Sequence, residues 1–196
     1  LFAVPVLAAA QLRSDFDLGA QWRVNSTARL MSGLRPMLPE HVDFAQTEVW
    51  TEHSAAMQSA WTGIREGRVS AMTAWRDAAI SPTCPLGKTL LYPFSGPDFF
   101  NAYWLFPDCE TFVMFGLEHP GDVPDLESMN ERQLQRLIAD VRAATRDLFE
   151  RNYFITENMA RQLRTAHLRG VVPLAMISMT LSGLDIVSID APTGAA

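Results

Sequence analysis

The chain has 196 residues, of which 48% are hydrophobic and 19% charged, a balance typical of a globular protein and too apolar for a disordered one. This length provides material for one domain, or for one domain with a small helical appendage. The formal net charge is −6, with 22 acidic residues against 16 Lys and Arg, so we do not expect nucleic acid as a partner.

The first ten residues, LFAVPVLAAA, form an uncharged apolar run that ends in three alanines and is followed at once by polar residues. Such a change is typical of the cleavage site of a secretory signal, so we interpret residues 1–10 as the remnant of a signal peptide. This predicts a periplasmic or secreted protein whose natural chain begins earlier. A buried N-terminal strand or helix is the alternative. No other run reaches the ~18 apolar residues of a membrane span.

Residues 11–82 predict a helical N-terminal part. Asn25 or Ser26 can cap a short helix, and a loop is expected over 36–43. Beyond it, two apolar stripes at helical spacing flank Gly67, which is a candidate C-terminal stop. We therefore predict a helical hairpin over about 47–80, with its tryptophans docked on the rest of the protein. Its stripes are Trp50, Met57, Trp61 and Ile64, then Val69, Met72, Trp75 and Ala79.

Residues 89–131 predict a strand, a tight turn, a short helix and a second strand. The segments 89–94 and 111–117 are nearly continuous apolar runs, as expected for strands covered on both faces. Between them, SGPD at 95–98 combines a capping residue, a proline suited to the first helical turn and an acidic residue for the positive end of the helix dipole. Two strands joined through a helix imply a parallel pair.

The C-terminal part predicts three helices and a further strand. Ser128 and Glu131 have the spacing of a capping box before a long amphipathic helix that reaches about residue 149. Further helices are expected over about 156–167 and over 171–181. The alternating segment LDIVSI, residues 184–189, predicts a third strand.

The predicted fold class is α/β, with a Rossmann-like parallel sheet and flanking helices over 83–196, preceded by the helical N-terminal part. Three strands are few for this many helices. We therefore expect the sheet to continue past the C-terminus, so that the chain is incomplete at both ends.

The two cysteines, Cys84 and Cys109, each lie a few residues before a predicted strand. Parallel neighbours would bring the two strand entrances to one edge of the sheet, which makes a disulfide plausible. Closing this span of 26 residues would stabilise the fold by about 3 kcal/mol on the loop-entropy model. Two unrelated small buried residues are the alternative.

The candidate site lies at the opposite edge, where both predicted strands end. Residues 89–131 contain eight acidic residues and no Lys or Arg, a local charge of −8. Open α/β sheets bind ligands at the carboxyl ends of their strands, so we predict a crevice there for a small molecule or a protein partner. Ser95 and nearby backbone N–H groups would bind a polar or anionic group, and Glu118 a hydroxyl or cationic one. The candidate ligand-binding residues are Ser95, Gly96, Asp98, Glu118, His119 and Asp122.

A nucleotide or S-adenosylmethionine-dependent enzyme is the first alternative. Glu118 lies 22 residues after Gly96, where Rossmann-like folds bind a ribose hydroxyl, although one glycine replaces the usual three. A serine hydrolase is the second, with Ser95 as nucleophile, His119 as base and Asp122 or Asp125 orienting it, although prolines occupy both small-residue positions of the elbow motif. The acidic and histidine residues lack the spacing of calcium or zinc ligands, so no metal and no cofactor is assigned.

Three segments resemble an uncharacterised bacterial family of predicted exported proteins: MTAWRDA, YPFSGPDFFNAYWLFPDCETFVMFGLE and LFERNYFIT. The likeness covers about residues 25–190, and YPFSGPDF is its most specific part. The resemblance implies bacterial origin, export and a longer chain at the C-terminus. It assigns no activity and no catalytic residue to these positions.

Overall fold

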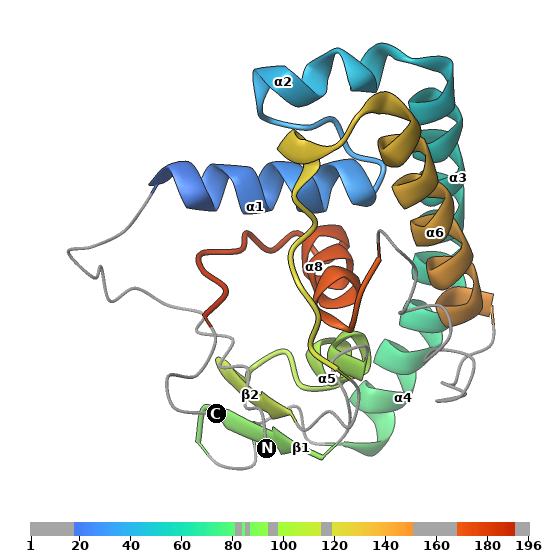
Figure 1. Cartoon of the computed structure of the whole chain (residues 1–196). Coiled ribbons are helices and arrows are strands. Elements are labelled where there is room, and N and C mark those ends of the chain that lie inside the picture. The colour runs from blue at the N-terminus through green and yellow to red at the C-terminus, as the bar shows by residue number, and fades with distance from the viewer. Residues whose placement is uncertain are drawn as a thin grey trace.

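The structure, a computed structural model, describes residues 18–80, 84, 87–93, 98–114, 119–150 and 168–190. These ranges combine helices with a two-stranded parallel sheet (Figure 1). The elements are α1 (Leu18–Met31), α2 (Pro39–Val42), α3 (Glu48–Ile64), α4 (Ser70–Ala79), β1 (Thr89–Tyr92), α5 (Phe99–Leu105), β2 (Thr111–Met114), α6 (Glu131–Glu150) and α8 (Val172–Leu181). Single turns lie at Phe44–Gln46 and Leu126–Ser128, both 3₁₀, and at Arg65–Val69, which is π-helical.

Helix α1 contains Asn25 and Ser26 in its interior, so the prediction that either residue caps a helix is wrong. Both side chains are buried and form tertiary hydrogen bonds. The Asn25 amide donates to the carbonyl of Ile186 at 2.7 Å and accepts from its N–H at 2.9 Å. Ser26 Oγ accepts from the backbone N–H groups of Met37 and Leu38. These bonds outweigh the local preference of Asn and Ser for caps.

Helices α3 and α4 form one continuous helix through the π turn Arg65–Val69, so the predicted hairpin and its stop at Gly67 are wrong (Figure 1). A π turn accommodates one extra residue without ending a helix. It brings Ile64 and Val69, five residues apart, onto one face, where both pack with Phe100. The break between the two apolar stripes therefore marks this extra residue and not a chain reversal.

The strands β1 and β2 pair in parallel, in register from Thr89 with Thr111 to Tyr92 with Met114, which confirms the predicted parallel pair. Helix α5 connects them and covers the sheet. Its Phe99 is 1% exposed and packs edge-on against Phe112 of β2. The predicted extensions of the two strands, 93–94 and 115–117, are not assigned as strand or lie outside the described ranges.

The main core lies between α1, α3, α6 and α8, and α3 and α6 run side by side (Figure 1). Helix α6 confirms the predicted amphipathic helix, but its capping box is not the predicted pair Ser128 and Glu131. The Asn130 N–H donates to Gln133 Oε1 at 2.8 Å, and the Gln133 N–H donates to Asn130 Oδ1 at 3.1 Å. This is the same reciprocal pattern, shifted by two residues.

The segment 184–189 is not a strand, contrary to prediction. Its central residue, Ile186, bonds the Asn25 side chain with both its N–H and its C=O, in place of a neighbouring strand. Helix α8 confirms the predicted helix over 171–181. The predicted helix over 156–167 and the signal-like residues 1–10 lie outside the described residues. In the part of the chain that the structure describes, no helix has the length and apolar character needed to cross a bilayer.

Candidate functional site

Three of the six predicted site residues are described. Asp98 is partly buried and directly precedes α5, whereas His119 and Asp122 are exposed and follow β2. Ser95, Gly96 and Glu118 lie outside the described residues. The contacts around Asp98 therefore define the candidate site.

Arg68, Asn101 and Asp98 form a chain of hydrogen bonds beside the carboxyl end of β1. Arg68 Nη2 donates to Asn101 Oδ1 at 2.7 Å, and Asn101 Nδ2 donates to Asp98 Oδ1 at 3.2 Å. The guanidinium carbon of Arg68 lies 5.4 Å from the ring centroid of Phe100, a cation–π distance. The amide of Asn101 thus links a cation on one side to a carboxylate on the other.

Tyr92, the last residue of β1, belongs to the same group of side chains. Burial raises the pKa of its hydroxyl, and the charge of Asp98 raises it further, while Arg68 opposes both. Burial lowers the pKa of Arg68, against the opposing effects of Asp98 and Tyr92. The tyrosine is therefore a neutral donor at physiological pH, and the arginine keeps its charge because guanidinium groups do not lose it in proteins.

Sequence reasoning missed Arg68 because it considered only residues 89–131, which contain no basic residue. Arg68 reaches this region from the π turn. The five-residue step from Ile64 to Val69 is the signal that could have revealed Arg68. Two buried residues five positions apart lie on one face of a helix only if the helix contains a π turn. Such turns are frequent at functional sites.

His119 does not have the geometry of a catalytic base. Its Nδ1 accepts a hydrogen bond from the Gly121 N–H at 3.0 Å. In a serine hydrolase triad the same nitrogen carries a proton and donates to a carboxylate, leaving Nε2 to accept the proton of the nucleophile. The arrangement at His119 is the reverse, so it gives no support to the hydrolase alternative.

The loop after β2 is fixed to the segment before α8. The N–H groups of Val171 and Val172 donate to the carbonyls of His119 and Pro120. Gly121 and Gly170 meet here with φ values of 72° and 69°, and a Cβ on Gly121 would lie 1.8 Å from the Arg169 carbonyl oxygen. Only glycine fits at this crossing, which is a contact between two backbones.

Two buried histidines lie away from the candidate site and hold α1. His53 is fully buried, its Nε2 lies 2.9 Å from the Met31 carbonyl oxygen, and burial lowers its pKa to about 4. His41 Nδ1 lies 3.0 Å from Ser26 Oγ. Because Ser26 already accepts two backbone N–H groups, its own O–H donates to His41. Burial lowers the pKa of His41 as well.

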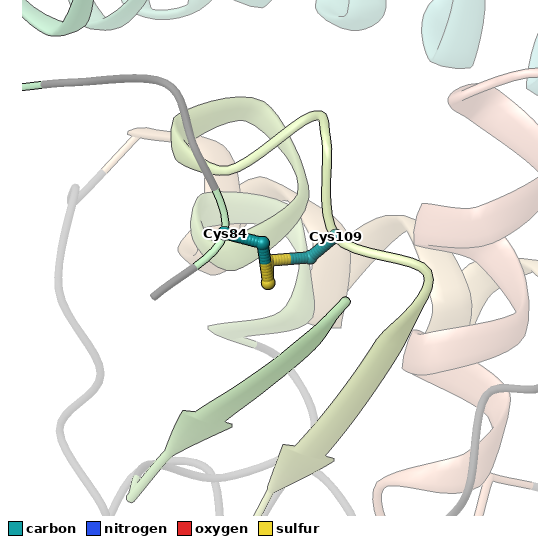
Figure 2. Close-up of a disulfide and its surroundings, with 2 residues drawn as sticks. All are labelled: Cys84 and Cys109. Atoms are coloured by element: carbon teal, nitrogen blue, oxygen red, sulfur yellow. A yellow bond between two sulfur atoms is a disulfide. The ribbon is translucent and has the colours of Figure 1, made fainter. Parts of the chain in front are cut away.

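Cys84 and Cys109, the candidate disulfide pair, are bonded in the structure, with their Cα atoms 5.1 Å apart. Figure 2 shows the bond beside the starts of β1 and β2. It therefore joins the amino ends of the two strands, while the Arg68–Asn101–Asp98 chain lies beyond the carboxyl end of β1. Among the residues with described positions, no three His, Cys, Asp or Glu side chains gather as a metal site.

No protein-family model matches the chain, and no curated protein or solved structure is significantly similar to it. The chemistry proposed for the site therefore comes from its own residues.

Proposed function

We propose that this chain is an exported bacterial domain that binds a small polar molecule at the carboxyl end of β1. The observation that supports this most is the convergence of Tyr92, Arg68, Asp98 and Asn101 from three separate elements. Binding sites commonly place a few oriented polar groups against aromatic side chains, and here the buried ring of Phe100 lies behind Arg68. The convergence is adjacent to SGPD, residues 95–98, where the sequence predicted the site.

A Rossmann-like arrangement of the sheet is part of this proposal. The unit β1–α5–β2 supports it, because parallel strands joined through a helix are the repeating unit of such folds. Ligands of these folds bind outside the carboxyl ends of the strands, the end at which Tyr92 lies. A binding role is favoured over hydrolysis because His119 lacks the orientation of a base.

Export is proposed from two observations. The apolar start of the chain, ending in Ala8–Ala10, is signal-like. The Cys84–Cys109 disulfide suits an oxidising compartment, since such bonds are rare in the cytosol.

A thermal-shift screen of the mature chain tests the binding role, using nucleotides, S-adenosylmethionine, sugars, amino acids and small organic acids. A compound that binds the folded state alone raises its stability by about 2.7 kcal/mol at a hundredfold excess over the dissociation constant. We expect Asp98→Asn to remove the shift and Asp108→Asn, the same change at an exposed turn, to retain it. Shifts that survive Asp98→Asn, or no shift with any compound, would contradict a binding site at β1.

A further inference from the structure

Arg68 is a partly buried cation that uses little of its hydrogen-bonding capacity among the described residues. A guanidinium has five N–H donors. Only Nη2 of Arg68 donates to a residue in the described ranges, and its acceptor is the neutral amide of Asn101. The ion pairs formed within those ranges join Arg76 to Asp77 and Lys88 to Glu110, so none neutralises Arg68 directly.

The surroundings hold this guanidinium in a fixed plane. The ring of Phe100 lies on one side of it, and Asn101 Oδ1 fixes one end of the fork. Asn101 itself cannot turn without losing its bond to Asp98. Holding a long cationic side chain in one orientation before a ligand arrives lowers the entropy lost when the ligand binds.

We propose that Arg68 is the receptor for an oxyanion, so that the small molecule bound at the carboxyl end of β1 carries a carboxylate or a phosphate group. This inference rests on the proposed function and names its ligand class. Two free N–H groups of an arginine fork match two oxygens of a carboxylate or phosphate. Tyr92 adds a protonated hydroxyl near the same charge. The bound anion would compensate a partly buried charge that forms no ion pair with another described residue.

The local charge limits which anions can bind. Of the acidic residues in 89–131, Asp98 acts on Arg68, and its negative charge disfavours a second anion at this guanidinium. A singly charged carboxylate experiences less of this repulsion than a doubly charged phosphate. We therefore expect acetate to bind more tightly than inorganic phosphate.

Titration of the full chain with sodium acetate or inorganic phosphate, at constant ionic strength with chloride, tests the inference. The readout is the position of the Arg68 Nε–Hε cross-peak in a ¹⁵N-correlated spectrum, assigned by its absence in Arg68→Met. We expect a saturable shift, and a saturable rise in Tm that Arg68→Met removes. Arg65→Met, an exposed arginine of the same turn, should keep the rise. The loss in affinity should be about tenfold or more, as for other charge-assisted hydrogen bonds.

An exchange of two side chains provides a second variant with the same net charge. In Asp98→Asn/Asn101→Asp the carboxylate moves from the far side of the amide to direct contact with Arg68. A structural role of Arg68 would be preserved or strengthened by this exchange, whereas anion binding should be lost because the arginine is already paired. Anion binding that persists in the exchange variant or in Arg68→Met overturns the inference.

The experiment separates this inference from the proposed function. Suppose that neutral or cationic compounds of the screen bind in a manner that depends on Asp98, while acetate and phosphate leave the Arg68 signal unchanged. The site would then stand and the ligand class would be wrong. If neither anions nor the compounds of the screen act at Asp98 or Arg68, both proposals fail.

Discussion

Single buried polar residues determine how α1 is held. Asn25 satisfies both backbone groups of Ile186, and it also donates to the Gln21 carbonyl within its own helix. A backbone group left unpaired in a protein interior costs about 1–3 kcal/mol. Removing such a polar side chain therefore lowers stability mainly because its buried backbone partner is left without a hydrogen bond.

Asn25→Ala should lower the free energy of unfolding by about 2–4 kcal/mol, because both groups of Ile186 lose their partner. Urea denaturation followed by circular dichroism measures the change. Asn130→Ala is the matched control, since it removes an exposed cap whose loss costs about 1 kcal/mol. Equal losses in the two variants would show that the pair with Ile186 contributes little.

His53 makes the stability depend on pH. Its pKa is about 4 in the folded protein because burial disfavours the charged form, against 6.5 when unfolded. The unfolded chain therefore binds more protons between these values, so stability is complete above about pH 6.5 and falls as the pH drops to about 4, by about 3 kcal/mol. His53→Gln can still donate to the Met31 carbonyl but does not titrate. The unfolding free energy of this variant should vary less between pH 4 and 6.5 than that of the unsubstituted protein. The same pH dependence in both proteins would contradict the role of His53.

At the scale of elements, the continuity of α3, the π turn and α4 can be tested at Gly67. This glycine has a negative φ, and a Cβ built on it meets no atom within 4 Å. Gly67→Ala should therefore raise the free energy of unfolding by about 0.5–1 kcal/mol, measured by urea denaturation.

Gly33→Ala provides the contrast. Gly33 has a φ of +70°, and its Cβ would lie 2.9 Å from the Met57 Cβ, so the same substitution should destabilise the protein. If Gly67→Ala also destabilised it, Gly67 would end the helix as the sequence suggested.

The elements with local signals were predictable from the sequence. The strands β1 and β2 are short apolar runs, and Pro97 and Asp98 mark the start of α5. Gly67 and the segment 184–189 were misread because their local preferences, a stop and a strand, are overridden by a π turn and by the amide of Asn25. The bonds of Asn25 to Ile186 leave no periodic trace in the sequence, and the π turn leaves only the five-residue step from Ile64 to Val69.

Of the residues in the candidate site, Asp98 was predictable from the sequence, whereas the contact between Arg68 and Asn101 was not. Asp98 follows from the strand–turn–helix pattern, because its position relative to β1 is set by neighbours in the chain. Arg68 and Asn101 meet across 33 residues, and their contact depends on how the π turn rotates the helix. Spacing read with the period of a regular helix gives the wrong phase after an extra residue, and the five-residue step from Ile64 to Val69 is the trace of that residue.

At the scale of the whole molecule, the Cys84–Cys109 bond joins the strand pair at the edge away from the site. Reduction, or the double substitution Cys84→Ser/Cys109→Ser, should lower the free energy of unfolding by about 3 kcal/mol. Thermal unfolding with and without reductant measures this. The chain has no other cysteine, so the reductant acts only on this bond, and an unchanged Tm in the reduced protein would contradict its role.

The pairing of Asn25 with Ile186 spans 161 positions of the chain. During synthesis, α1 emerges from the ribosome long before the residue that satisfies its buried amide. The packing around α1 therefore cannot be completed before residue 186 has been synthesised. Until then α1 remains accessible to chaperones, and to any machinery that accepts only unfolded substrates.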